Sequence, residues 1–252
     1  MRYLSRTFGV FGAATFIGCG GADAGSLSHA DQVGRQVIVG VDISGSRTAE
    51  ELEAARELAE RVVKSLSFRD RLVMLRMHDV GVRHDRQLWS DTMPSAVRPE
   101  QPTAGDRQRL QQAQDGALAV IPMFFDSLQA GRIKNTDVVA SLKTIAESAQ
   151  DGARRRPVVI LLSDMIQSTP GLRFESVAGI PGAEWIARQK NEGLVPQLDG
   201  VCVAVIGADA STPHGVRLRR FWTDYFEAAG VAISPAAYRY DVTPGAPLPC
   251  LH

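Results

Sequence analysis

Short, nearly continuous apolar runs alternate with amphipathic segments from about residue 35 onward. Residues 36–41, 71–77 and 157–162 are the clearest apolar runs, and their length and composition are typical of buried strands. Between them, residues 48–66 and 137–150 carry apolar side chains three and four positions apart, which is the spacing of amphipathic helices. Strands that are apolar on both faces and alternate with helices occur in parallel sheets. The pattern therefore predicts an α/β fold with a doubly wound, mostly parallel sheet and helices on both faces.

The remaining elements are predicted from weaker versions of the same two periodicities. We expect a third strand at 83–89, a loop at 93–105, helices at 106–129, 183–191 and 215–229, and strands at 201–206 and 231–234. The apolar and aromatic residues of the helix at 215–229 fall at helical spacing, so we expect them to pack into the core.

The first residues have the pattern of an export signal rather than of a folded domain. Arg2 and Arg6 precede an apolar stretch at 8–18, which is too short to span a bilayer. The tetrapeptide Phe-Ile-Gly-Cys that ends at Cys19 resembles the lipobox of bacterial lipoproteins, in which the cysteine is lipidated. Phe16 stands where that family usually has Leu, and an ordinary secretory signal with an incidental cysteine is the alternative.

We accordingly divide the chain into four parts and place the mature protein outside the inner membrane. They are a signal peptide at 1–19, a flexible tether at 20–34, one domain at 35–235 and a Pro-rich tail at 236–252. A lipidated Cys19 would make the protein a membrane-anchored lipoprotein that faces the periplasm or the cell exterior.

The charge content of the chain narrows the classes of partner that it can bind. The 28 basic and 28 acidic residues give a formal net charge of zero, which argues against nucleic acid as a partner and against electrostatic binding to an acidic membrane. The lipid anchor is then the only expected contact with a membrane.

Apart from Cys19, the chain has Cys202 and Cys250. They could form a disulfide in an oxidising compartment, or Cys202 could stay a free buried thiol within its strand.

Oxygen-bearing side chains follow two of the predicted strands and begin one predicted helix. Asp42, Ser44 and Ser46 come directly after the first strand, Thr136 precedes the helix at 137–150, and Asp164 follows the strand at 157–162. In open α/β sheets, sites form beyond the carboxyl ends of the strands. Carboxylate and hydroxyl oxygens are ligands of hard cations. The sequence therefore predicts one cation site that is built from three segments.

Helix capping is the simpler explanation for each of these residues alone. Ser46 or Thr48 could cap the first helix and Thr136 the later one, with Asp137 complementing the helix dipole. Thr103 is the nearest competitor for the place of Thr136, but no convincing apolar helix follows it directly. All five residues in one order, on the expected elements, favour the cation site.

Asp42, Ser44, Ser46, Thr136 and Asp164 resemble the metal-ion-dependent adhesion site of von Willebrand factor type A domains, also called integrin I domains. In that family Asp-x-Ser-x-Ser follows the first strand, a Thr precedes a later helix and an Asp follows the fourth strand. The resemblance covers residues 35–235 and implies a Mg²⁺ or Mn²⁺ ion. It further implies that an Asp or Glu of a partner protein binds the ion, and that the domain binds without catalysing a reaction.

Other functions have weaker support in the sequence. A Mg²⁺-dependent phosphohydrolase of haloacid dehalogenase type would use Asp42 as its nucleophile, but that family normally has a second Asp where this chain has Ser44. A degenerate A domain with a structural role is another alternative. The pairs His78-Asp79 and His84-Asp85 lack the further ligands of a zinc site.

Overall fold

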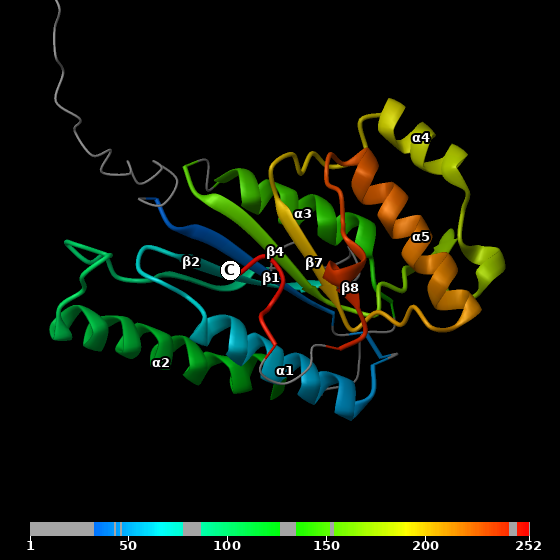
Figure 1. Cartoon of the computed structure of the whole chain (residues 1–252). Helices are drawn as coiled ribbons and strands as arrows, with labels where there is room; N and C mark the ends of the chain where they lie inside the picture. Colours follow the sequence, from blue (N-terminus) through cyan, green and yellow to red (C-terminus); the bar gives the residue numbers. More distant parts are fainter. Residues whose placement is uncertain are drawn as a thin grey trace, which may run out of the picture.

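The computed structural model describes residues 33–42, 44–45, 47–77, 87–126, 135–151, 154–241 and 246–251. In this part the chain forms an α/β fold around a mixed sheet with the strand order β3-β2-β1-β4-β7-β8 (Figure 1). Neighbouring strands run parallel except β2 and β3, which are antiparallel. The strands of this sheet are β1 (Arg35–Asp42), β2 (Arg71–Met77), β3 (Gln87–Thr92), β4 (Arg156–Leu162), β7 (Cys202–Ile206) and β8 (Tyr238–Arg239).

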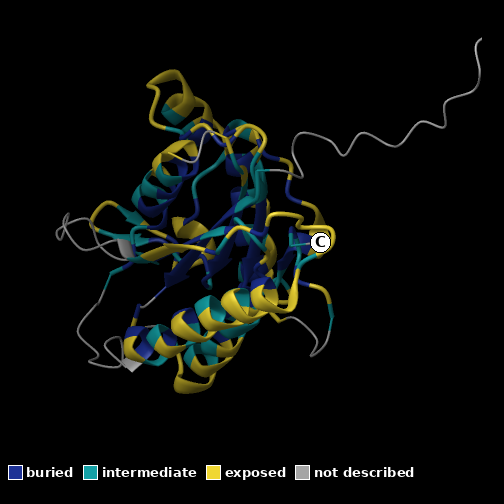
Figure 2. Cartoon of the chain, turned by 90° about the vertical axis from the view of Figure 1, so that its left-hand side faces the viewer, coloured by how far each residue is buried: buried dark blue, intermediate teal, exposed yellow. Residues whose placement is uncertain are grey.

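Helices lie on either side of the sheet, with α1 and α2 on one side and α3 and α5 on the other (Figure 1). Buried residues fill the sheet and the inner faces of the helices, whereas the outer faces are exposed (Figure 2). The helices are α1 (Ala49–Lys64), α2 (Ala104–Asp126), α3 (Val138–Asp151), α4 (Ala183–Asn191) and α5 (Pro213–Ala228), with short 3₁₀ turns at η2 (Val177–Gly179) and η3 (Pro235–Ala237). A small hairpin of β5 (Ser168–Thr169) and β6 (Leu172–Arg173) lies apart from the main sheet.

Strand β1 lies at the centre of the sheet, and all but its first residue are buried. This explains why its sequence is apolar on both faces. A Cβ atom on Gly40 would come within 3.1 Å of Ile145 in α3, of Leu161 in β4 and of Met77 in β2. A glycine at this position therefore lets α3 approach β1 closely, and the packing fixes where the carboxyl end of β1 lies.

Most predicted elements are present with small shifts in their bounds. Of the predicted strand at 83–89, residues 83–86 lie outside the described residues, and β3 runs from Gln87 to Thr92, three residues past the predicted end, where it pairs antiparallel with β2. The predicted strand at 231–234 is wrong. Val231 and Ile233 are buried there, but Pro235 begins a 3₁₀ turn and the edge strand forms later, at Tyr238–Arg239. Helix α2 begins at Ala104, inside the predicted loop.

The apolar face of α5 is part of the core, as predicted. Phe221, Trp222, Tyr225 and Phe226 are buried, and the ring of Phe221 lies 4.8 Å from that of Phe174 in an edge-to-face contact. Such aromatic pairs add to the stabilisation that burial alone provides.

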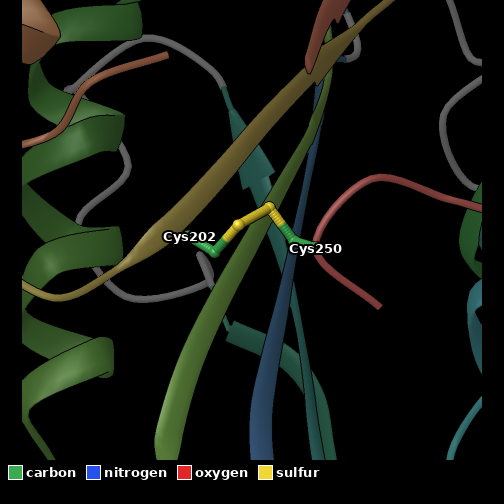
Figure 3. The surroundings of a disulfide bond; sticks show 2 residues. All are labelled: Cys202 and Cys250. Carbon is green, nitrogen blue, oxygen red and sulfur yellow. A yellow bond between two sulfur atoms is a disulfide. The ribbon is translucent and has the colours of Figure 1, made fainter. Parts of the chain in front are cut away.

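The C-terminal segment is attached to the domain by a disulfide and by two arginines. Cys202 at the start of β7 is bonded to Cys250, with 5.7 Å between their Cα atoms (Figure 3). The guanidinium of Arg35 donates to the carbonyl of Leu251 at 2.7 Å, and Arg61 donates to that of Ala246 at 2.7 Å. The tail is therefore held against the sheet and against α1.

The predicted signal and Cys19 lie outside the described residues, as do both His-Asp pairs. Across the part of the chain that the structure describes, every helix is too short or too polar to traverse a bilayer.

Candidate metal centre

Asp42 is the last residue of β1, and its side chain is fully buried. Because β4 pairs with β1 in parallel, with Val41 opposite Leu162, the carboxyl ends of the two strands lie side by side. The residues that follow β4 therefore reach the same edge of the sheet as Asp42. This is the position at which open α/β sheets form their sites.

Three groups donate hydrogen bonds to the Asp42 carboxylate. The backbone N–H of Ser44 donates to Oδ1 at 2.9 Å, and the hydroxyl of Thr136 donates to the same oxygen at 3.4 Å. The hydroxyl of Ser163 donates to Oδ2 at 2.7 Å. Ser44, Thr136 and Ser163 are themselves buried. The structure thus brings together Asp42, Ser44 and Thr136, whereas Ser46 lies outside the described residues.

Thr136 does not cap α3, which was the alternative to its predicted role as a metal ligand. The side chain of Asp137 caps this helix, because its Oδ1 accepts a hydrogen bond of 2.9 Å from the N–H of Ala140. The hydroxyl of Thr136 is thereby left to face Asp42. Its backbone carbonyl accepts a 2.8 Å hydrogen bond from the N–H of Ser168, so the residue is held from two sides.

Thr103, the competing candidate, lies elsewhere. Its hydroxyl donates to the Asp106 carboxylate at 2.7 Å and accepts from the Asp106 N–H at 3.1 Å, which is a capping arrangement at the start of α2. These hydrogen bonds lower the pKa of the Asp106 carboxyl, with the Thr103 hydroxyl as the largest cause.

Ser163 and Asp164 occupy a tight turn after β4. The hydroxyl oxygen of Ser163 accepts a 2.8 Å hydrogen bond from the N–H of Met165. Oδ1 of Asp164 accepts one of 2.8 Å from the N–H of Ile166. Met165 has a φ of 64°, a left-handed conformation that side chains other than glycine rarely adopt. The indole of Trp222 in α5 donates to the carbonyl of Met165 at 2.8 Å. The turn is therefore held in place by the core.

Arg47 binds to the carboxyl end of β4 beside this turn. The sequence did not predict this contact. The side chain of Arg47 is 3% exposed, and its guanidinium donates to the carbonyl of Leu162 at 3.2 Å and to that of Glu51 at 3.0 Å. The side chains of Arg47 and Glu51 also form an ion pair of 3.8 Å. An arginine so soon after the Asp-x-Ser-x-Ser segment gives no sequence signal that it will be buried.

Tyr238 in β8 lies within range of the charge of Asp164. Burial raises the pKa of the Tyr238 hydroxyl, and the negative charge of Asp164 raises it further. Sequence reasoning missed this residue because it assigned Tyr238 to the tail beyond the domain.

The donor set fits a hard cation. Asp42 is a buried carboxylate, and among the described residues no Lys or Arg forms an ion pair with it. A buried carboxylate that has hydrogen bonds but no counter-charge is costly, and a bound cation would supply that counter-charge. Hydroxyl oxygens of Ser44 and Thr136 are neutral ligands of the kind that Mg²⁺ accepts. Within the described ranges, no group of three or more His, Cys, Asp or Glu side chains lies close enough together to hold a metal ion. A metal bound at Asp42 would therefore depend on neutral hydroxyl ligands.

Neither a protein-family model nor a curated protein matches this sequence. Among solved structures, the chain is similar to proximal thread matrix protein 1 from the mussel byssus, with 16% sequence identity and a TM-score of 0.40. The similarity covers 83% of this chain and 43% of the other, so this chain spans less than half the length of the structure that it matches. A likeness of this size is too weak to assign a family or a function.

Proposed function

We propose that this chain is a metal-dependent protein-binding module with the doubly wound arrangement of a von Willebrand factor type A domain. One observation carries the proposal: the buried carboxylate of Asp42 is contacted by hydroxyls from two other segments of the chain, those of Thr136 and Ser163. Capping alone does not account for this convergence, because Asp137 and Thr48 already cap α3 and α1.

The hydroxyls of Ser44, Ser46 and Thr136 would hold a Mg²⁺ or Mn²⁺ ion, with Asp42 and Asp164 acting partly through water. A bound ion of this kind supplies an open coordination position that accepts a carboxylate oxygen. Asp42 balances the charge of the ion and orients the Thr136 hydroxyl, and Ser163 fixes the rotamer of Asp42. The partner protein offers an Asp or Glu, so the ion lies at the centre of the interface.

The proposal includes no catalysis. Each oxygen of the Asp42 carboxylate accepts a hydrogen bond, and the side chain has no exposed surface from which it could attack a substrate. A nucleophile would need an accessible oxygen at this position.

We further propose that the domain acts outside the inner membrane and is anchored there through a lipid on Cys19. The disulfide between Cys202 and Cys250 supports an oxidising compartment. Cell fractionation of the Cys19→Ser variant tests the anchor, because loss of the lipid should move the protein from the membrane fraction to the soluble fraction.

Titration of the purified protein with Mg²⁺ in a calorimeter, together with thermal unfolding, tests the metal site. At about 100 times the dissociation constant, Mg²⁺ should stabilise the folded state by about 2.7 kcal/mol. Asp42→Asn and Thr136→Val should abolish this effect, whereas Ser168→Ala, which removes a hydroxyl bonded to Glu175 at the surface, should keep it. An unchanged Mg²⁺ response in Asp42→Asn would refute the proposal.

The partner is approached by capture from an envelope extract, with the purified domain as bait in Mg²⁺ and in EDTA. A partner that binds through the ion should be retained in Mg²⁺ only, and Asp42→Asn should lose it as well.

A further inference from the structure

A hollow of about 340 Å³ is lined in part by Arg47 and Leu162, which lie near residues of the candidate metal centre in the sequence. It is bordered by α1 on one side and by the segment after β8 on the other, and we call it the α1 groove. Its apolar wall contains Ala54 and Leu58 from α1, Leu162 and Ile206 from the strand ends, and Tyr240. Leu162 and Ile206 are buried at its base, whereas the Tyr240 side chain at its margin is 55% exposed. The volume is within the range of sites that bind small ligands or a few side chains.

The mouth of the α1 groove is acidic. Glu50, Glu57 and Asp241 line it and are exposed, and within the described residues none of the three forms an ion pair. Four carboxylates line the groove, those of Glu50, Glu51, Glu57 and Asp241, against the two guanidinium groups of Arg47 and Arg61, whose hydrogen bonds hold them in place. Arg47 is bonded to Leu162 and Glu51, and Arg61 is bonded to Ala246. The field at the mouth is therefore negative, although the whole chain is neutral.

We infer that the α1 groove is a docking site for a protein segment in which one or two large apolar side chains are flanked by Lys or Arg. The apolar anchor would fill the hollow, and the flanking cations would meet Glu50, Glu57 and Asp241. Opposite charges at the rim of an interface select the partner and speed association. A large apolar or aromatic side chain that fills a pocket is often the centre of such an interface.

The groove and the candidate metal centre adjoin along the chain. Leu162 lines the groove and precedes Ser163, and Arg47 lines it shortly after Ser44. One partner could therefore place an acidic residue at the ion and a basic, apolar segment in the groove. Docking in the groove does not require the ion, and only the assignment of both contacts to the same partner rests on the proposed function.

Two labelled synthetic peptides test the inference by fluorescence anisotropy in EDTA. One has the sequence Lys-Lys-Leu-Phe-Lys-Lys, and the other has glutamate at each lysine. The lysine peptide should bind and the glutamate peptide should not. Glu57→Lys should weaken binding of the lysine peptide by about tenfold, a loss typical of one close charge pair. Glu192→Lys, the same change at the exposed end of α4, should leave it unaltered.

Chemical-shift mapping locates the bound peptide, and Tyr240→Ser tests the apolar wall at an exposed position where folding is not at risk. We expect shifts at Leu58 and Tyr240 and weaker binding in this variant. Equal binding of the two peptides would overturn the inference, and so would an equal effect of Glu57→Lys and Glu192→Lys. Self-association of the chain in sedimentation that Tyr240→Ser abolishes would overturn it as well, because the groove would then be covered by a second copy. Because these measurements are made in EDTA, failure of the metal proposal would leave their outcome unchanged.

Discussion

The hydroxyl of Ser163 donates a 2.7 Å hydrogen bond to Oδ2 of Asp42 and so joins the carboxyl ends of β4 and β1. Both residues are fully buried, and the same hydroxyl accepts a hydrogen bond from the N–H of Met165. Ser163 is thus the link between the candidate metal centre and the turn that carries Asp164.

Ser163→Ala should lower the free energy of unfolding by about 2–3 kcal/mol, because it leaves a buried carboxylate oxygen and a buried N–H without their partner. Urea unfolding measures the loss. Ser168→Ala removes a hydroxyl that is bonded to Glu175 at the surface, and its effect should stay within about 0.5 kcal/mol. Similar losses in the two variants would contradict the structural role that we assign to Ser163.

The ion pair of Arg35 and Asp70 should contribute strongly to stability. Asp70 accepts hydrogen bonds from the Arg35 guanidinium, from the Arg35 N–H and from the Ser67 N–H, and its side chain is 2% exposed. Asp70→Ala leaves the part-buried guanidinium without its counter-charge, although its bonds to the carbonyls of Ser65 and Leu251 remain, so we expect a loss of about 3 kcal/mol in urea unfolding.

Two controls belong to that measurement. The double variant Arg35→Met, Asp70→Ala should lose less than the sum of the single changes, since it removes both charges. Glu53→Ala breaks a surface pair with Arg56 and should change stability far less than Asp70→Ala does. Additive single effects would argue against coupling between Arg35 and Asp70.

Cys202→Ser should destabilise the protein through the denatured state. The disulfide closes a loop with a sequence separation of 48 residues. For a loop of this length the chain-entropy relation gives about 4 kcal/mol. Unfolding of the wild type with and without reductant should show the same difference, and reductant should leave Cys202→Ser unchanged. A midpoint that does not respond to reductant would mean that the bond is absent in solution.

Stability should fall as the pH rises above about 10, the ordinary pKa of tyrosine. Burial raises the pKa of Tyr225 and of Tyr238, so the folded protein keeps phenolic protons that the unfolded chain releases. The unfolded state then binds fewer protons, and the free energy of unfolding decreases with pH by about 1.4 kcal/mol per unit for each tyrosine. Below the ordinary pKa this stabilisation is fully present.

Denaturant titrations at several alkaline pH values measure how steeply the free energy of unfolding decreases with pH. Tyr225→Phe and Tyr238→Phe should each make this decrease shallower, because the hydroxyl that titrates only in the unfolded chain is gone. An unaltered slope in both variants would assign the alkaline loss to other groups.

The sequence was sufficient to predict the central strands and the helices, because their apolar periodicity is strong. Strand β2 has the predicted bounds, and α1 begins after Thr48, one of two predicted caps. The positions of β3 and β8 could not be predicted. Both are edge strands with few apolar residues, and their register depends on pairing with β2 and β7.

The candidate site was predicted in part for a similar reason. The order of Asp42, Thr136 and Asp164 along the chain indicates one sheet edge, and β1 and β4 do place their ends together. Which of Thr136 and Asp137 would cap α3 could not be decided from residue type, because both side chains are good caps. The contacts of Ser163 and Arg47 depend on tertiary packing, which leaves no local pattern in the sequence.

The hydrogen bond between Arg35 and Leu251 has a consequence for which end of the domain would lie nearest to its membrane anchor. It places the beginning of β1 and the end of the described chain at one pole of the domain, while Asp42 lies at the other end of the same strand. Seven residue steps of a strand measure about 23 Å. In a protein held through residues before Arg35, as we propose, the tethered pole of the domain is the one that carries Arg35, and Asp42 lies at the opposite, free end of β1.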